Sequence, residues 1–304
     1  MTRGAPLPLP ERRQVSLPSA RFSFAHSLQR IPMPTVKPYC TALDQGNAYW
    51  MARLASSIYQ CKLGSKLPDD AGILSNLKAE DPGFISVQGF SKNSAQAALV
   101  EHSSYLAMVF RGTDEPADWI DNLNAFPEQA LFGAFHRGFL HSVQDIWDPL
   151  FKRYSDLNQK KPRALFVTGH SLGGAMATVA SSILIQEDEG FTSTYTFGQP
   201  RAITRDTGRV YNVEAKSKTF RFQNNNDIVT RAPARIMGYT HVGTFLYITQ
   251  QKQIQQDPGR WLQFLDSAGG AMDSIKEKGL DAVEDHGMNN YLEAVRKWNF
   301  VKAA

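Results

Sequence analysis

Two hydrophobic patterns alternate along the chain and predict its elements. Continuous apolar runs, typical of strands buried on both faces of a sheet, occur at 105–110 and 164–167. Shorter runs predict strands at 193–197, 218–222 and 244–248, and antiparallel or edge strands at 84–90 and 97–101. Because helical segments separate the later strands, we expect an α/β fold.

Apolar residues at helical spacing mark the segments between those strands. Residues 43–59 carry Met51, Leu54 and Ile58 at this spacing. A longer apolar stripe begins at Phe139 and continues to Tyr154. Both segments are predicted to be helices that pack on the sheet.

The stretch ALFVTGHSLGGAMATVA, residues 164–180, carries the clearest chemical signal. A buried run leads into a sharp turn at Ser171 and then into a small-residue segment of helical character. A serine at the tip of such a turn adopts a strained backbone, which requires residues without side chains two positions before and after it. Gly169 and Gly173 meet this requirement. Ser171 is therefore a candidate nucleophile; the alternative is a glycine-rich helix start that binds a phosphate or nothing.

Three motifs together resemble the class 3 lipases of the α/β-hydrolase superfamily. They are GHSLGGA at 169–175, FRGTD at 110–114 and DH at 285–286. The resemblance extends over roughly residues 41–300. It implies an α/β-hydrolase fold, with a mostly parallel central sheet, helices on both faces and a short helical lid.

The resemblance also assigns the groups that would hold a developing oxyanion. Arg111-Gly112-Thr113 follows the strand at 105–110 and matches the family's R-G-T/S motif. Thr113 would offer its backbone N–H and hydroxyl, and Leu172 would supply the second N–H. The alternative for Thr113 is an ordinary turn threonine.

The catalytic acid is expected after the serine, because the order in α/β-hydrolases is Ser, then Asp or Glu, then His. Asp227 lies in a loop after the strand predicted at 218–222, where the acid belongs. Asp206 competes with it, although no strand leads to Asp206. We predict Asp227 as the acid.

The base must follow the acid, which leaves His241 and His286 as candidates. His286 matches the family's late D-H context before a final helical segment, although the family's tyrosine is displaced to Tyr291. His286 is the predicted base. His241 is the fallback, and otherwise a structural histidine bonded near the acid loop. His136 is expected to be a structural hydrogen-bonding residue, and His170 to point away from Ser171.

Residues 115–126 predict a short amphipathic helix above the site. Its apolar stripe consists of Trp119, Ile120, Leu123 and Phe126. Such a helix can cover an acyl pocket and swing open at a lipid surface, and the resembled lipases carry a lid here. The alternative is a surface helix fixed on the core.

Composition bounds the domain organisation. The 304 residues, 42% of them hydrophobic, suit one large α/β domain or two small ones. We predict one domain at 41–304, behind a proline-rich basic arm at 1–40. The chain carries a net charge of +4 and its first 38 residues carry +5, so the remainder carries 4 − 5 = −1. The body is therefore close to neutral, which argues against a nucleic-acid-binding face. Cys40 and Cys61 could form one disulfide.

No targeting segment stands out. Prolines and arginines interrupt every apolar run in residues 1–25, and no later run reaches membrane-spanning length. We therefore expect no standard signal peptide and no transmembrane helix. Localisation stays open between the cytoplasm, export without an N-terminal signal, and a leader absent from this sequence.

These observations predict a serine carboxylic-ester hydrolase, a triacylglycerol lipase whose partners are ester substrates and the lipid–water interface. A phospholipase A1 or a feruloyl-type or short-chain esterase would share every motif. A catalytically inactive hydrolase-fold scaffold would have lost Ser171, Asp227 or His286, and the chain retains all three. No metal or cofactor is expected, because zinc-ligand spacings and phosphate-binding glycine loops are missing. The oligomeric state is left open.

Overall fold

The computed structural model describes residues 1, 34–114, 126–258 and 285–298. Contacts divide the chain into two compact units, residues 1–33 and 34–304. Residues 34–40 belong to the second unit: the Trp50 indole N–H donates to the Pro34 carbonyl at 2.7 Å, and the Thr192 hydroxyl donates to the Pro38 carbonyl at 2.8 Å.

An eight-stranded sheet forms the centre of the second unit, in the order β1-β2-β3-β6-β7-β9-β11-β12. The strands from β3 to β11 are parallel, whereas β1, β2 and β12 are antiparallel to their neighbours. The strands are β1 (Phe84–Lys92), β2 (Ala95–His102), β3 (Tyr105–Phe110), β6 (Ala164–His170), β7 (Ser193–Phe197), β9 (Thr219–Asn224), β11 (Thr244–Ile248) and β12 (Ile254–Gln256).

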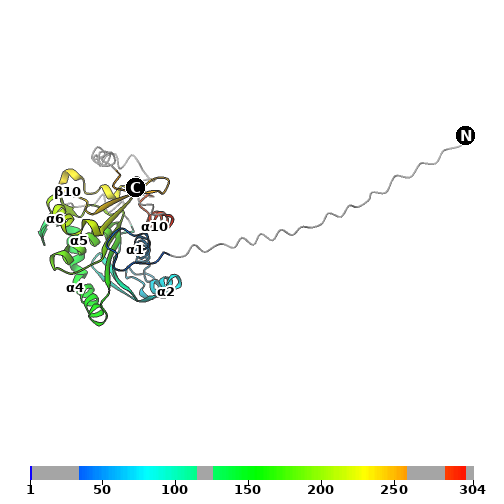
Figure 1. The fold of residues 1–304 in the computed structure, drawn as a ribbon, viewed down its shortest axis with the longest axis horizontal. Coiled ribbons are helices and arrows are strands. Elements are labelled where there is room, and N and C mark those ends of the chain that lie inside the picture. The colour runs from blue at the N-terminus through cyan, green and yellow to red at the C-terminus, as the bar shows by residue number, and fades with distance from the viewer. Residues whose placement is uncertain (2–33, 115–125, 259–284, 299–304) are drawn as a thin grey trace. The chain divides into compact units, whose positions relative to one another are not determined.

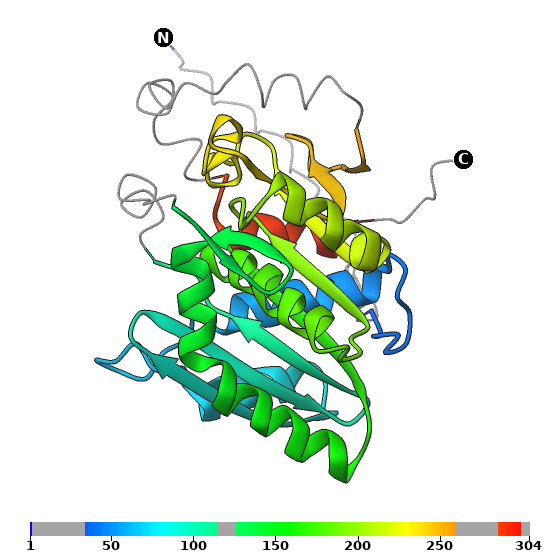
Figure 2. The ribbon, with the colours of Figure 1, turned by 90° about the vertical axis from the view of Figure 1, so that its left-hand side faces the viewer.

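Helices cover both faces of this sheet (Figures 1 and 2). One face carries α4 (Arg137–Lys160), α5 (Leu172–Gln186) and α6 (Arg205–Ala215). The other carries α1 (Gln45–Ser57), α2 (Asp70–Glu80) and α10 (Met288–Lys297). Figure 1 shows α10 beside α1, which brings a late segment of the chain against an early one.

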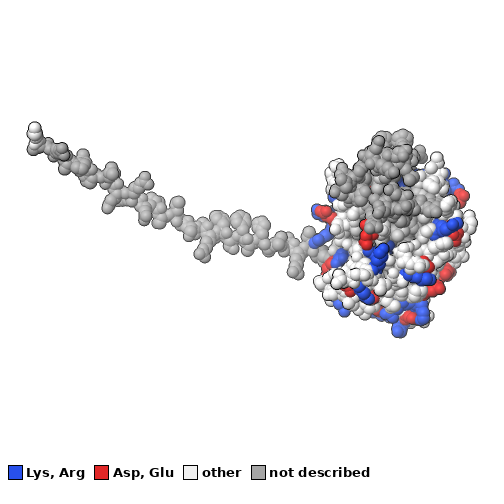
Figure 3. Space-filling view, turned by 180° about the vertical axis from the view of Figure 1, so that it is seen from behind, with Lys and Arg blue, Asp and Glu red and all other residues white. Residues whose placement is uncertain are grey.

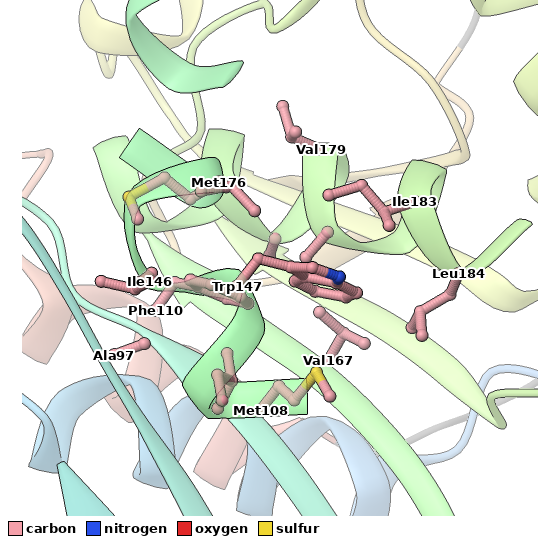
Figure 4. Close-up of a cluster of buried hydrophobic side chains, with 14 of the residues drawn as sticks. Ala97, Met108, Phe110, Ile146, Trp147, Val167, Met176, Val179, Ile183 and Leu184 are labelled. Atoms are coloured by element: carbon pink, nitrogen blue, oxygen red, sulfur yellow. The ribbon is translucent and has the colours of Figure 1, made fainter. Parts of the chain in front are cut away.

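Each face has its own hydrophobic core, because the central strands are buried on both sides. On the α4 and α5 face, Trp147 and Met176 pack over Met108 and Val167 of the strands (Figure 4). On the opposite face, Trp50 of α1 packs against Phe84 of β1 with ring centroids 5.3 Å apart. The predicted apolar stripe of α4, from Phe139 to Tyr154, is buried as expected.

A second, four-stranded sheet lies outside the main one, in the order β10-β8-β5-β4. Its strands are β4 (Pro127–Ala130), β5 (Gly133–His136), β8 (Ile203–Thr204) and β10 (Tyr239–Thr240). Single 3-10 turns lie at Lys216–Lys218, Val229–Arg231 and Arg235–Met237. The sequence did not predict this sheet, α2 or β12. Two- to four-residue strands are too short to show a period.

Two further observations bear on the sequence expectations. Cys40 and Cys61 are both free thiols, so the one possible disulfide is not formed. Within residues 34–114, 126–258 and 285–298, no helix is long and apolar enough to cross a membrane.

Candidate active site

Ser171 lies at the junction between β6, which ends at His170, and α5, which begins at Leu172. Its backbone has φ 58° and ψ −132°, a strained conformation for a residue with a side chain. The Ser171 amide donates to the Phe197 carbonyl of β7 at 2.9 Å, and its side chain is fully buried. The neighbouring strand thus holds the predicted strand-turn-helix in place.

The two flanking glycines are required by close backbone contacts. A Cβ atom on Gly169 would lie 2.2 Å from the Gly173 carbonyl oxygen, and one on Gly173 would lie 2.1 Å from the Phe110 carbonyl oxygen. Both distances are far below van der Waals contact. The turn can therefore form only without side chains at these positions, as the sequence predicted.

Asp227 follows β9 and is completely buried, yet both of its carboxylate oxygens accept hydrogen bonds. The Val229 amide donates to Oδ1 at 2.9 Å, and His286 Nδ1 donates to Oδ2 at 2.9 Å. The Tyr291 hydroxyl also donates to Oδ2. Burial and the adjacent carboxylate hold the pKa of Tyr291 well above its ordinary value, so the phenol remains a donor.

His286, two residues before α10, has its two ring nitrogens in different situations. Nδ1 bonds to Asp227, and Nε2 has no hydrogen-bond partner among the described residues. The buried hydroxyl of Ser171 likewise has none within the described part of the chain. The geometry therefore leaves one basic nitrogen and one hydroxyl available for chemistry.

His170 turns its ring away from this chemistry and holds the backbone of His286. His170 Nε2 donates to the His286 carbonyl at 2.7 Å, and His170 Nδ1 accepts from the Tyr59 hydroxyl at 2.8 Å. The two imidazole rings lie with centroids 4.5 Å apart. Burial and the neighbouring His286 keep the pKa of His170 well below its ordinary value, which fits a neutral ring with its proton on Nε2.

The loop after β3 lies against the serine turn. A Cβ atom on Gly112 would lie 3.0 Å from Ser171 Cβ, which places the next residue, Thr113, at the edge of the site. The Arg111 guanidinium bonds to Asp114 and to Gln96 Oε1 within and beside this loop. Leu172 is the first residue of α5, and the first N–H groups of a helix have no intrahelical acceptor.

The competing acid and the fallback base have other bonding partners. Asp206 is an exposed residue of α6 that pairs with Arg209. His241 Nε2 donates to the Thr230 carbonyl at 2.8 Å, which confirms its expected bond near the acid loop.

His136 corrects an expectation from the sequence. It was predicted to be a structural hydrogen-bonding residue, but neither ring nitrogen bonds to any described residue. Its ring instead stacks on Phe139 at 4.2 Å, since the side chain is buried among aromatic groups.

Most of the predicted lid lies outside the described residues. Trp119, Ile120 and Leu123 belong to residues 115–125, which the structure does not describe. Phe126, the last residue of the predicted stripe, is 56% exposed, and the Arg137 guanidinium lies 5.9 Å from the centre of its ring.

Comparisons with known proteins agree with this geometry. The sequence profile of the family described as Lipase (class 3) matches residues 107–237, which include the serine turn and the acid loop. A lipase of Rhizomucor miehei is 32% identical over 164 residues, covering 51% of this chain and 45% of that protein. Phospholipase A1-II 1 of Oryza sativa is 26% identical over 189 residues, covering 53% of this chain and 47% of that protein. The chain therefore spans slightly less than half the length of these two relatives.

Over residues 107–237 the chain resembles the class 3 lipase family. A solved triacylglycerol lipase, whose catalytic centre is described as a serine protease triad, is similar in fold with a TM-score of 0.60. The two sequences are 25% identical, and the match covers 68% of this chain and 82% of that lipase. The fold is accordingly that of an α/β-hydrolase, as the sequence predicted.

The sequence analysis missed two residues of this candidate site. Gly198, with φ +58°, approaches so closely that a Cβ atom there would lie 2.8 Å from Asp227 Oδ2 and 3.0 Å from the His286 ring. Tyr291 was noted only as a displaced family residue, although its hydroxyl contacts the buried carboxylate. The glycine and proline of GQPR, residues 198–201, are a local signal for a tight turn at Gly198 but not for its contacts. For Tyr291, the departure from the family's spacing concealed its contact with Asp227.

Proposed function

We propose that this chain is a serine carboxylic-ester hydrolase that cleaves acylglycerol esters through an acyl-enzyme on Ser171. One observation carries the proposal: the 2.9 Å hydrogen bond from His286 Nδ1 to the buried Asp227 carboxylate. This bond fixes the imidazole tautomer and leaves Nε2 unprotonated, which a general base requires.

Each residue then has a defined role. His286 Nε2 accepts the Ser171 proton as the serine oxygen attacks the ester carbonyl carbon, and Asp227 stabilises the resulting imidazolium. The N–H groups of Thr113 and Leu172 hold the carbonyl oxygen as it becomes negative. The tetrahedral intermediate collapses, the alcohol leaves with the proton from His286, and the acyl group stays on Ser171. Water repeats the sequence and releases the acid.

We propose that the enzyme acts on substrate at a lipid–water interface. The apolar stripe of Trp119, Ile120, Leu123 and Phe126 suits a cover over an acyl pocket, and the exposed Phe126 ring is the described part of it. An apolar helix of this kind has a better partner in a lipid surface than in water. We propose that these residues act as a lid and that the rate rises when an interface forms.

A phospholipase A1 is the second candidate, because the rice relative carries that name. It would use the same serine, acid and base on the acyl ester of a phospholipid. Ser171, Asp227 and His286 would serve a triacylglycerol lipase and a phospholipase A1 equally well. Only a comparison of substrates can therefore distinguish the two activities. A feruloyl-type or short-chain esterase would cleave only small soluble esters.

The deciding experiment compares wild type with Ser171→Ala on p-nitrophenyl esters of short and long acyl chains, tributyrin and phosphatidylcholine. Ser182→Ala is the matched control, because Ser182 is also a buried serine, on the following helix, and bonds only to the Thr178 carbonyl among the described residues. We expect Ser171→Ala to lose at least about 10⁴-fold in kcat. Ser182→Ala should retain wild-type turnover within a few fold.

The substrate pattern decides among the candidates. A rate that jumps as tributyrin passes its solubility limit supports a lipase with an interfacial lid, and preferred cleavage of phosphatidylcholine supports a phospholipase A1. Equal activity of Ser171→Ala and wild type would reject the nucleophile.

A further inference from the structure

Asp285, the residue before the proposed base, lies in an environment unlike that of the surface carboxylates. On the face of the molecule in Figure 3, acidic and basic side chains are interspersed, as is typical of charges that water solvates. The half-buried carboxylate of Asp285 instead accepts hydrogen bonds from amide groups of the acid loop, residues 225–228. One of these partners, Asn225, lies 60 residues earlier in the chain. Asp285 therefore joins the segment that carries the proposed acid to the segment that carries the proposed base.

Three consecutive asparagines make this connection. Asn225 Nδ2 donates to Asp285 Oδ2 at 3.0 Å, and the Asn226 amide donates to the same oxygen at 3.2 Å. Asn224 Nδ2 donates to the backbone carbonyl of Asp285 at 2.8 Å, with a longer contact of 3.4 Å to Oδ1. Both the side chain and the backbone of Asp285 are thus held.

The asparagines are themselves fixed to the sheet, so they can serve as a reference for the base. Asn224 is completely buried at the end of β9. The Asn225 amide donates to the Ile248 carbonyl at the end of β11 at 2.8 Å. Asn225 has a left-handed backbone with φ 39°, which asparagine tolerates better than most residues. The ends of two neighbouring strands therefore determine the position of Asp285.

The position of the base depends on its backbone as well as on its ring. The bond from Nδ1 to Asp227 sets the direction of the His286 ring, and His170 holds the His286 carbonyl. Neither of these contacts holds the chain on the N-terminal side of His286, and the bonds of Asp285 do. Because a displacement of about 1 Å between reacting groups can lower a rate by about 100-fold, this additional restraint matters for the proposed chemistry.

We propose that Asp285 is a positioning residue that fastens the base to the acid loop. Its bonds to the three asparagines keep His286 Nε2 at a constant place relative to Ser171 while the imidazole gains and loses a proton. The effect on the rate rests on the proposed ester hydrolysis. The connection between the two segments does not, and it can be measured without a substrate.

Steady-state kinetics on a soluble p-nitrophenyl ester test the effect on the rate. Asp285→Ala should lower kcat by about tenfold with little change in KM, because the base is displaced while the groups that bind the ester are not. Asp285→Asn should recover most of this loss, since its side-chain oxygen can still accept from Asn225 and Asn226.

Asp69→Ala is the matched control. Asp69 is also half-buried, and its carboxylate likewise accepts from one backbone amide and one side-chain amide. These belong to Gly72, at 3.2 Å, and to Gln60, at 3.1 Å, at the start of α2. This variant loses hydrogen bonds of the same kind and should retain the wild-type kcat within a few fold.

A pair of variants tests the direct contact between the two side chains. Asn225→Asp keeps the shape of the side chain and tolerates the left-handed backbone, but it places a second carboxylate against Asp285. Because like charges repel, kcat should fall at least as far as in Asp285→Ala. Combining Asn225→Asp with Asp285→Asn removes one of the two carboxylates, so kcat should rise again. A general loss of stability would not produce this recovery.

Hydrogen–deuterium exchange of the full chain measures the connection itself. Asp285→Ala should increase exchange in peptides from residues 224–229 and 285–298, because both segments lose a restraint. Asp69→Ala should increase it only around α2. Unchanged exchange in Asp285→Ala would overturn the proposal whatever the kinetics show.

The kinetic results separate this proposal from the proposed function. An inactive wild type would reject the hydrolysis, and the connection would then stand or fall on the exchange result alone. If the wild type is active, a wild-type kcat in Asp285→Ala would overturn the proposal even where exchange increases, because the connection would then not position the base. Equal losses of kcat in Asp285→Ala and Asp69→Ala would overturn it as well.

Discussion

At the scale of single residues, the site depends on hydrogen bonds to a carboxylate that water does not reach. Asp227 is fully buried, so every donor to it replaces a lost water molecule. Tyr291 supplies one such donor and also accepts from the Asn224 amide at 2.9 Å, which ties α10 to the end of β9. Tyr291 is thus a positioning residue for the proposed acid.

We expect Tyr291→Phe to lower kcat by roughly 10–100-fold with little change in KM, because a hydrogen bond to a buried charge contributes about 1.5–3 kcal/mol. Steady-state kinetics on a soluble ester measures both constants. Tyr247→Phe makes the same change on β11, where the hydroxyl contacts Asn225 at a weak 3.4 Å, and should leave kcat unchanged. A wild-type kcat in Tyr291→Phe would show that the Val229 amide and His286 are sufficient to position Asp227.

Individual residues also show what a sequence can and cannot predict. Ser171 was predictable because its strained backbone requires glycines two positions before and after it, and these are visible in the local sequence. Gly198 and Tyr291 act through contacts with residues distant in the chain, and local spacing does not record such contacts. The proposed roles of Asp227 and His286 depend on the chain order of the resembled family. That order does not exclude His241, whose bond to the Thr230 carbonyl is visible only in the structure.

At the scale of elements, β3, β6 and α5 meet at a single crowded point. Gly173, in the first turn of α5, lies against the Phe110 carbonyl at the end of β3. The close approach of α5 to the end of β3 therefore depends on the absence of a side chain at Gly173. Long buried strands such as β3 and β6 were predictable from their apolar runs, whereas this approach and the short strands of the second sheet were not.

Gly173→Ala should lower the free energy of unfolding by about 3 kcal/mol or more, because the added Cβ would lie 2.1 Å from a backbone oxygen that cannot move aside. Chemical denaturation measures this change. Gly190→Ala is the control: a Cβ there meets no atom within 4 Å among the described residues, and stability should change by less than about 0.5 kcal/mol. Equal effects of the two substitutions would mean that α5 can shift to accept the methyl group.

At the scale of the whole molecule, the fold buries several histidines in their neutral form. Burial lowers the pKa of His136 to about 4 and holds those of His170 and His241 well below the ordinary 6.5. When such a chain unfolds, each histidine regains its ordinary proton affinity. The unfolded state then binds more protons than the folded state below pH 6.5, so acid favours unfolding.

The free energy of unfolding should therefore fall as pH decreases from 6.5 towards 4. Above pH 6.5 these histidines are neutral in both states and should add no pH dependence. His136→Leu should reduce the slope by about 1.4 kcal/mol per pH unit, because one proton no longer binds on unfolding. Urea denaturation at several pH values measures the slope. His141→Leu, which replaces an exposed histidine, should nearly retain the wild-type slope. An unchanged slope in His136→Leu would mean that His136 is protonated equally in both states.

The contact between His170 and His286 has a consequence for the entropy of the reaction. An imidazole in water turns freely, and a catalyst that must orient one loses that freedom in every cycle. Here the His286 carbonyl is held by His170, Nδ1 is held by Asp227, and the ring lies against a second ring. The freedom to rotate is lost once, when the chain folds. The proposed base thus begins each turnover already facing in one direction, and its orientation adds nothing to the activation entropy.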